Sequence, residues 1–323
     1  SFYERLGNTQ PPAWVTDLSR RIDSNQSSED LKWLGMTPVM REWVGGRAAQ
    51  GFRTNGINIV NKVFEASVEV DIDDIRRDKT GQFMDRIDEL PGRAQQHRAR
   101  LLTDLIIAGE TTNCYDGQYF FDTDHSEGSS GTQDNDLVFD ISDNATGGTA
   151  TAPLASTIQG AVLKAVQAIM GFKDDKGEPM NEGAMNFDVM VPATFMGETI
   201  KALTMPLVGG GDSNVLLSNQ FSLRPVINPR LTWTTKLAVF CKDGATRPLI
   251  EQVEQDPIMD AIAEGSELEI RERKHLYTVT RIGNVAGIGI KKARQIKAAA
   301  EHYLNEENKR RAELDALEKA QTP

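Results

Sequence analysis

Residues 63–73 alternate apolar and polar side chains with the two-residue period of a β-strand, and this alternation constrains the fold more than any other feature of the sequence. One face of the predicted strand is apolar, and the other carries acidic and small polar side chains. The apolar face consists of Phe64, Ala66, Val68, Val70 and Ile72. Such a face must be covered by another part of the protein or by a partner.

The residues before this strand predict a long β-hairpin that runs from Trp43 to Ile72. Asn55 and Gly56 have the chemistry of a tight turn, and the alternating strand follows them. A ribbon of two strands cannot cover its own apolar face and is marginally stable alone. We therefore expect the hairpin to lie against something else that covers this face, including Phe64 and Val68.

The strand ends in an aspartate-rich stretch, residues 71–78, with the sequence DIDDIRRD. An EF-hand calcium loop needs alternating oxygen ligands, a central glycine and a terminal glutamate, and this stretch lacks that pattern. We expect these aspartates to turn the chain and to cap the following helix, with Arg76 and Arg77 as ion-pair partners.

A second polar stretch places Asp122, Asp124 and His125 within four residues. This set is the basis of an enzyme hypothesis, a soluble metal-dependent hydrolase. A metal site needs further ligands at ordered spacing, and the whole chain has four histidines. We favour a structural turn. The sequence therefore predicts no catalytic, cofactor-binding or metal-binding residue, no cofactor and no enzyme activity.

Residues 83–110 predict a long helix that is bent at Pro91 and Gly92 and ends at Gly109 as a C-cap. The remaining chain predicts a mixture of helices and short strands. Helices are expected at 153–171 and 193–203. Strands are expected at 186–192, 236–241, 247–253, 266–273 and 275–283.

Composition excludes several classes of function. The net charge is −11, and between Leu101 and Leu163 the chain has ten acidic residues and no lysine or arginine, so sequence-specific nucleic-acid binding is disfavoured. No window approaches the ~18 consecutive apolar residues of a membrane helix, which predicts a soluble protein. Cys114 and Cys241 stand far apart and form no CxxC motif, as in proteins of a reducing cytoplasm.

Three stretches of the sequence resemble the major head subunits of phage Mu and its relatives, which are tailed-phage capsid proteins of the Hong Kong 97-like fold. They are REWVGGR at 41–47, NKVFEASVEVDIDDIRRDKTGQF at 61–83 and YDGQYFFDTDH at 115–125. The order of arm, long hairpin, long helix, mixed domain and returning strands is also similar to that fold. The C-terminal tail is an addition to the family's pattern.

The resemblance implies an α+β fold with five parts. They are an N-terminal arm at 1–42, an E-loop at 43–84, a peripheral domain with a long spine helix at 85–114 and 265–290, an axial domain at 115–264, and a helical tail at 291–323. The E-loop is expected to reach over an adjacent subunit. The candidates for this contact are Trp43, Arg47, Phe52, Arg53, Phe64 and Val68.

Two expectations about assembly follow from the resemblance. Replacing Phe64 and Val68 together with aspartate should leave a folded subunit that cannot close shells. Some relatives of the fold cross-link an E-loop lysine to the next subunit. Lys62 lies on the descending strand of the predicted hairpin, so we expect no such cross-link, and boiled shells should give no ladder of subunit multiples in SDS electrophoresis.

The implied function is that of a structural subunit, which self-assembles as pentamers and hexamers into an icosahedral phage head. The head would enclose double-stranded DNA without sequence-specific binding, be assembled in the bacterial host cytoplasm and not involve a membrane. The implied partners are scaffold, maturation protease and portal proteins, with a decoration protein left open. An encapsulin-like bacterial shell is the alternative, and copurified enzyme cargo in place of DNA would identify it.

Overall fold

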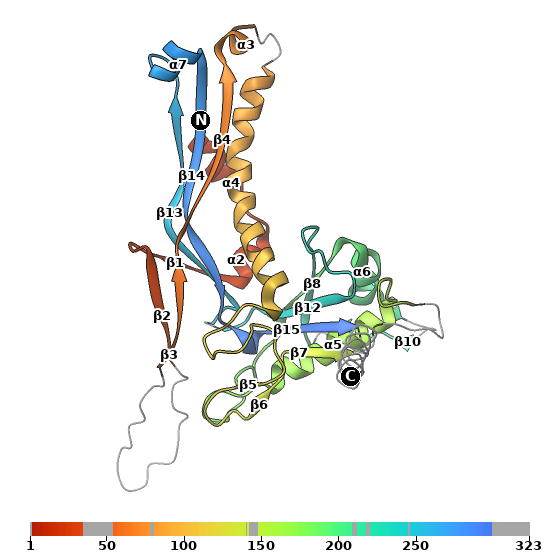
Figure 1. Cartoon of the computed structure of the whole chain (residues 1–323). Helices are drawn as coiled ribbons and strands as arrows, with labels where there is room; N and C mark the ends of the chain where they lie inside the picture. Colours follow the sequence, from red (N-terminus) through yellow and green to blue (C-terminus); the bar gives the residue numbers. More distant parts are fainter. Residues whose placement is uncertain are drawn as a thin grey trace, which may run out of the picture. The chain divides into compact units, whose positions relative to one another are not determined.

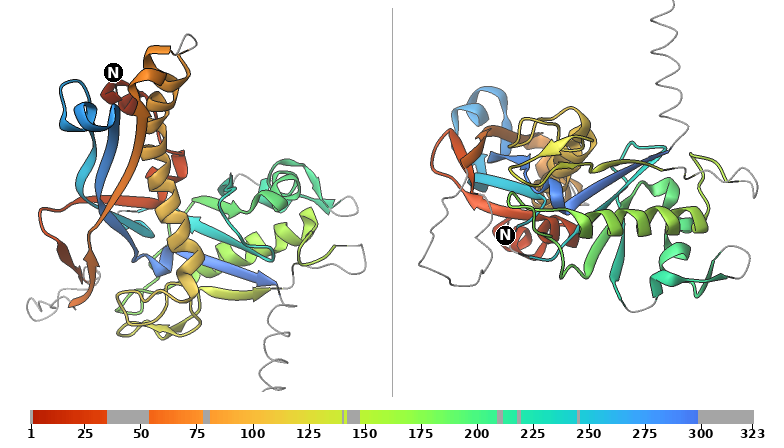
Figure 2. Two further views of the ribbon diagram at one scale, coloured as in Figure 1. Left: turned by 45° about the horizontal axis from the view of Figure 1, so that its top comes forward. Right: turned by 90° about the horizontal axis from the view of Figure 1, so that it is seen from below.

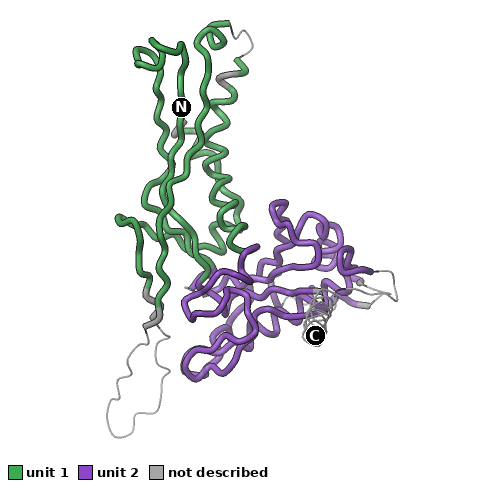
Figure 3. Tube along the Cα trace, in the orientation of Figure 1, with its two compact units in different colours: residues 1–33, 55–106, 249–287 green, residues 34–54, 107–248, 288–323 purple. Residues whose placement is uncertain are grey.

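The computed structural model of the 323-residue chain forms two compact units, which Figure 3 colours separately. The structure describes residues 2–34, 54–77, 81–139, 141, 148–208, 212–217, 220–244 and 246–298. Unit 1 comprises residues 1–33, 55–106 and 249–287, and unit 2 comprises residues 34–54, 107–248 and 288–323. Both units combine helices with sheets, as the predicted α+β class requires.

Unit 1 contains a four-stranded sheet with a long helix beside it (Figure 1). The strand order is β1 (Ser19–Asp23), β13 (Leu249–Ile262), β14 (Lys274–Gly287) and β4 (Lys62–Asp71). The long helix is α4 (Gln82–Ile107), which continues through Pro91 and Gly92. Its apolar side chains recur at helical spacing, and Ile87, Leu90, Leu102 and Ile106 are buried. The predicted long helix is therefore confirmed.

Shorter elements complete unit 1. They are α1 (Phe2–Asn8), α2 (Ala13–Leu18), β2 (Ser28–Leu34), β3 (Thr54–Val60), α3 (Ile72–Arg77) and α7 (Glu267–Glu272). β2 and β3 form a separate two-stranded sheet. Residues 266–273 were predicted as a strand, and this prediction is wrong because α7 occupies most of them.

The predicted hairpin turn at Asn55 and Gly56 is also wrong, because both residues lie inside β3. β3 pairs with β2, and β4 pairs instead with β14, from Lys62 opposite Gly283 to Asp71 opposite Lys274. β3 and β4 meet at Asn61, whose side-chain amide donates to the carbonyl of Gln26 at 2.7 Å. β4 thus has a partner distant in sequence, which a local turn signal cannot reveal.

The apolar face of β4 is partly covered within unit 1, with Phe64 and Val68 half-buried and Ala66 exposed. The ring of Phe64 packs against the ring of His97 on α4, with a centroid distance of 4.4 Å, and Val70 and Ile72 are buried. Unit 1 thus covers part of this face by itself, and a further contact with another subunit stays a prediction. The double aspartate variant of Phe64 and Val68 is now expected to destabilise unit 1 itself, because Phe64 is part of its internal packing.

The aspartates at the end of β4 act as the sequence predicted, with a different ion-pair partner. The Asp71 carboxylate accepts a hydrogen bond from the Asp73 N–H at 2.8 Å, which fixes the start of α3. Asp73 pairs with Arg273 at 2.7 Å and not with Arg76 or Arg77. The hydrogen bond from Arg273 lowers the pKa of Asp73.

Unit 2 is a five-stranded sheet with helices packed on one face. The strand order is β11 (Ser222–Ile227), β8 (Asn186–Val191), β12 (Lys236–Cys241), β15 (Ala293–Ala298) and β7 (Asp136–Phe139). The helices are α5 (Ala155–Gly171), which lies along the sheet in Figure 2, and α6 (Met196–Thr204). Ile158, Val162 and Ile169 of α5 are fully buried in the core. The helices and strands predicted over 153–203 and 236–241 are confirmed.

Small elements occupy the loops of unit 2. Two-stranded sheets are formed by β5 (His125–Ser126) with β6 (Thr132–Gln133) and by β9 (Leu207–Val208) with β10 (Asp212–Ser213). Short 3-10 helices lie at Ala108–Glu110, Ala193–Phe195, Val215–Leu217 and Ile290–Lys292.

Gly109 does not end α4 as a left-handed C-cap, because it is not among the glycines with a positive φ and a 3-10 turn follows the helix. A close contact explains why this residue is a glycine. A Cβ atom at this position would lie 2.5 Å from the Phe121 ring, and the Phe121 N–H donates to the Gly109 carbonyl at 2.9 Å. The close approach of the Phe121 side chain therefore requires glycine.

The bounds of the predicted domains differ from those of the two units, and two of the differences involve strands. Residues 249–262, predicted for the axial domain, form β13, which pairs with β14 inside unit 1. Residues 293–298, predicted as part of a helical tail, form β15, an interior strand between β12 and β7. For β15 a pairing with strands distant in sequence overrides the local helix propensity.

Candidate functional site

The predicted contact residues fall into two groups. Trp43, Arg47, Phe52 and Arg53 lie outside the described residues. Phe64 and Val68 are half-buried on β4, where Val68 is paired with Tyr277 of β14 and Phe64 with Arg281. A role of these six residues in contacts between subunits stays a prediction.

Arg281 belongs to a buried ionic cluster that ties α4, β13 and β14 of unit 1 together. The carboxylate of Glu251 on β13 is 1% exposed and accepts hydrogen bonds from Arg98 of α4 at 2.6 Å and from Arg281 at 2.5 Å. Burial lowers the pKa of Arg281, and the negative charge of Glu251 offsets part of this effect. The cluster is a structural element that local sequence patterns did not indicate.

His97 lies between this cluster and Phe64, and its protonation should weaken unit 1. Burial, together with the positive charges of Arg281 and Arg100, lowers the pKa of His97 from the ordinary 6.5 to about 4. The unfolded chain therefore binds the proton at a higher pH than the folded chain. The stability of unit 1 is expected to fall as the pH drops from 6.5 toward 4.

His97→Phe tests this expectation. The phenyl ring keeps the packing against Phe64 and cannot bind a proton. The melting temperature of the variant should therefore fall less between pH 7 and pH 4.5 than that of the wild type. His97→Gln serves as a second variant without a charge. Equal losses of melting temperature in all three proteins would show that His97 does not carry this acid sensitivity.

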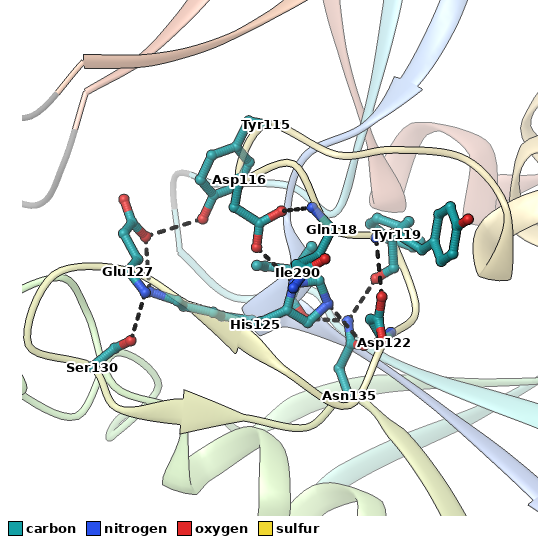
Figure 4. Close-up of polar contacts among 12 residues, drawn as sticks. Tyr115, Asp116, Gln118, Tyr119, Asp122, His125, Glu127, Ser130, Asn135 and Ile290 are labelled. Carbon is teal, nitrogen blue, oxygen red and sulfur yellow. Dashed lines mark hydrogen bonds and ion pairs between the residues drawn. The ribbon is translucent and has the colours of Figure 1, made fainter.

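His125, the centre of the hydrolase hypothesis, is part of a buried hydrogen-bond network in unit 2 (Figure 4). Its Nδ1 lies 2.7 Å from an Asp116 carboxylate oxygen, and its Nε2 lies 3.2 Å from the side-chain oxygen of Asn135. The carboxylate of Asp122 accepts instead from the backbone N–H groups of Tyr119 and Thr123. The ring of His125 is thus fixed by two oxygens and is not exposed to a substrate.

Asp122, Asp124 and His125 are not brought together as ligands. Asp124 is exposed, whereas His125 is 2% exposed. Within the ranges that the structure describes, no three His, Cys, Asp or Glu residues are placed to hold a metal ion. Asp122 and His125 instead make the hydrogen bonds that hold this loop, as in a structural turn.

Asn135 is the hub of the network, and sequence reasoning missed it. Its amide nitrogen donates to the carbonyls of Phe120 at 2.7 Å and Ile290 at 3.1 Å, while its oxygen accepts from the N–H of Asp122 at 2.8 Å. The asparagine thus joins the loop after α4 to the segment that leads into β15. A single buried asparagine in a loop belongs to no sequence pattern from which its role can be predicted.

The acidic stretch between residues 101 and 163 is partly neutralised inside unit 2. Basic residues in and before β15 pair with four of its acids. The pairs are Lys291 with Glu127, Arg294 with Asp134, and Lys297 with both Glu110 and Asp136. Burial raises the pKa of Asp136 despite its contact with Lys297. The stretch is therefore expected to repel nucleic acid less strongly than its net charge alone predicts.

Six large apolar side chains are exposed within 22 residues of unit 2. They are Met196, Ile200, Met205, Leu207, Val215 and Leu217, each between 40% and 60% exposed. They lie on α6 and at its C-cap, on β9 and on the 3-10 turn that follows β10. Single exposed apolar residues are ordinary, whereas a group on neighbouring elements is typical of an interaction surface. None of the described helices is long and apolar enough to cross a membrane.

The chain has the Hong Kong 97-like fold of solved capsid structures. The capsid of cyanophage P-SCSP1u superposes with a TM-score of 0.54 and 12% identity, covering 90% of this chain and 89% of that chain. A virus-like particle from Pyrococcus furiosus gives a TM-score of 0.52 and 9% identity, with 92% and 96% covered. At these identities the likeness shows the fold alone.

Sequence comparison finds a family match in the N-terminal part of the chain. Residues 2–153 match the model of the Mu-like prophage major head subunit gpT. The FluMu major head subunit of Haemophilus influenzae is 37% identical over 143 residues, 44% of this chain and 46% of that protein. The major capsid protein of Escherichia phage Mu is 34% identical over 119 residues, 37% and 39% respectively. Both matches span less than half of the relative's length. The N-terminal part of the chain is thus similar to Mu-like major head subunits.

Proposed function

We propose that the protein is the major subunit of an icosahedral phage head, which assembles as pentamers and hexamers around packaged double-stranded DNA. The observation that carries this proposal is the combination of a capsid fold over about nine tenths of the chain with a family match over residues 2–153. The net charge of −11 supports a container that does not adhere to its DNA.

The exposed apolar side chains of residues 196–217 support self-association. A protein that stayed monomeric would leave this surface in water, whereas association buries it and gains the hydrophobic free energy. In a closed shell each subunit makes several such contacts, so each contact can be weak by itself. We infer that the scaffold, maturation protease and portal proteins of the same phage are the further partners, and that the product is a virion capsid assembled in the host cytoplasm.

The fold alone does not separate a phage head from a cellular shell, since a virus-like particle from Pyrococcus furiosus shares it. The match to Mu-like head subunits favours the phage head over an encapsulin-like shell. Purified particles that contain DNA support the phage head, and particles that contain an enzyme cargo support the alternative.

Assembly is the direct test of the proposal. The protein coexpressed with the scaffold protein of its phage is expected to give closed particles or capsomer rings in negative-stain electron microscopy. Uniform particles of monomer or dimer size at high protein concentration would contradict the proposed function.

Leu207→Asp and Val215→Asp test the apolar surface of unit 2. Both side chains are about 60% exposed, so each variant should keep the melting temperature of the wild type. Shell yield should fall strongly, because a carboxylate would have to be desolvated in the contact. Leu207→Met, which keeps the apolar character, is the matched control and should assemble normally. Normal shells from both aspartate variants would show that this surface is not an assembly contact.

A further inference from the structure

The hydrogen bonds around His125 determine which of its ring nitrogens carry protons. The residue lies on β5 and is 2% exposed, so its nitrogens depend on protein partners rather than on solvent. Nδ1 faces an Asp116 carboxylate oxygen at 2.7 Å, and Nε2 faces the side-chain oxygen of Asn135 at 3.2 Å (Figure 4). A ring nitrogen that faces an oxygen without a proton must itself be the donor.

The orientation of the Asn135 amide is fixed by its other contacts. Its nitrogen donates to two backbone carbonyls, those of Phe120 at 2.7 Å and Ile290 at 3.1 Å, and its oxygen accepts from the Asp122 N–H at 2.8 Å. Exchanging the oxygen and the nitrogen would place the oxygen against two carbonyls and a donor against the Asp122 N–H. The atom that faces Nε2 is therefore an acceptor, and Nε2 carries a proton.

The carboxylate of Asp116 places the same requirement on Nδ1. The side chain is 3% exposed, and its other oxygen accepts from the N–H of Gln118 at 3.2 Å. A buried carboxylate is strongly destabilised without a compensating charge. Lys291 is already paired with Glu127 at 3.0 Å, so a His125 ring that is protonated on both nitrogens completes a second pair.

The other titratable side chains of the network do not supply this charge. Tyr115 and Cys114 interact electrostatically with both carboxylates, and burial raises the pKa of each, so they stay neutral near pH 7. Asp122 is half-buried, and its carboxylate accepts from two backbone N–H groups. The positive charge beside Asp116 therefore comes from His125.

We propose that Asp116 and His125 form a proton-dependent latch in unit 2, in which a doubly protonated imidazole ring holds the loop at 115–135 on the segment that leads into β15. The ring is bound to this loop at both nitrogens. Asn135 extends the connection to the carbonyl of Ile290, just before β15. Loss of the second proton therefore weakens the attachment of the loop to this segment.

The latch depends on pH in the direction opposite to that of His97 in unit 1. The folded latch holds a proton that the unfolded chain gives up more readily, so it stabilises unit 2 at low pH, and this stability is lost as the pH rises. Without the second proton, a lone pair on Nδ1 or Nε2 faces an oxygen that cannot donate. The network then loses one hydrogen bond and contains a buried carboxylate without its cation.

Nuclear magnetic resonance of the unassembled subunit, with 15N in the rings of its four histidines, tests the charge state directly. An exposed ring is about nine tenths neutral at pH 7.5, whereas both nitrogens of His125 should still show the chemical shifts of protonated nitrogens. The His125→Gln variant identifies the signals. In the matched variant Asp116→Asn the amide can donate to Nδ1, so the ring should carry one proton, on Nε2.

Stability gives a second readout. Between pH 6 and pH 9 the melting temperature of Asp116→Asn should fall less than that of the wild type, because its ring needs no second proton. A wild-type His125 with one proton at pH 7.5 would overturn the proposal, and this measurement decides alone if the variant does not fold. A doubly protonated ring in Asp116→Asn would overturn it as well, because the carboxylate would not be the group that holds the proton. Neither measurement needs a shell, so the result is independent of the proposed function.

Discussion

Replacing Glu251 with glutamine is expected to lower the free energy of unfolding of unit 1 by about 3–5 kcal/mol, the usual effect of breaking a buried ion pair. Glu251 is 1% exposed and is the carboxylate between Arg98 and Arg281. Glutamine keeps the size of the side chain but leaves two guanidinium groups, one of them buried, without a compensating charge. The loss is therefore electrostatic and not a consequence of a cavity.

The matched control is Asp104→Asn, which removes a carboxylate from an ion pair on the surface of the same unit. Asp104 lies 3.6 Å from Arg100, and both side chains are about 60% exposed. Exposed pairs contribute less than about 1 kcal/mol, so this variant should unfold almost as the wild type does. Urea unfolding of the unassembled subunit gives both values. Equal, small losses in the two variants would show that the buried cluster contributes little to stability.

Local periodicity predicted the elements whose side chains pack on one neighbouring layer. α5 repeats its apolar residues at helical spacing, and β8 and β12 are apolar runs between turn signals, so their identity was visible in the sequence. α4 was predicted for the same reason. Their burial in the core of each unit follows from these patterns.

Pairings between segments distant in sequence were not visible. The alternation in β4 predicted a strand but not its partner β14, and so led to a hairpin with the wrong neighbour. β15 was not predicted because basic residues in and before it favour a solvent-exposed helix. In the folded protein, acidic residues of the loop at 110–136 neutralise these charges. Asn135 and Glu251 act through contacts that span many residues, and no spacing rule identifies them.

α7 differs from these cases, because the sequence did contain its signal. Ser266 and Glu269 form the S-x-x-E pattern of a capping box. The Ser266 hydroxyl accepts from the Glu269 N–H, and the Glu269 carboxylate accepts from the N–H of Gly265, one residue before the cap. The alternating charges that follow favoured a strand, and the cap was overlooked. The resemblance to capsid proteins was the stronger guide, because it drew on long motifs and identified the fold that local patterns gave only in pieces.

Replacing Lys291 with methionine is expected to lower the free energy of unfolding of unit 2 by about 3–5 kcal/mol, because it leaves a buried carboxylate without its cation. Lys291 is 6% exposed, and its Nζ lies 3.0 Å from Glu127, which is also 6% exposed. The hydroxyl of Tyr115 donates to the same oxygen of Glu127 at 3.1 Å, but this neutral group cannot replace the ammonium charge. Methionine fills most of the space of the lysine stem, so the effect comes from the lost charge.

The matched control is Lys201→Met, where a lysine of α6 pairs with Glu198 at 2.6 Å near the surface and its loss should cost less than about 1 kcal/mol. Hydrogen exchange locates the effect of the buried pair. Lys291→Met should raise exchange in β15 and in the loop at 110–136, which the basic residues of β15 neutralise, and leave β13 and β14 of unit 1 unchanged. Faster exchange throughout both units would show that β15 stabilises the chain as a whole and that its ion pairs are not a local device of unit 2.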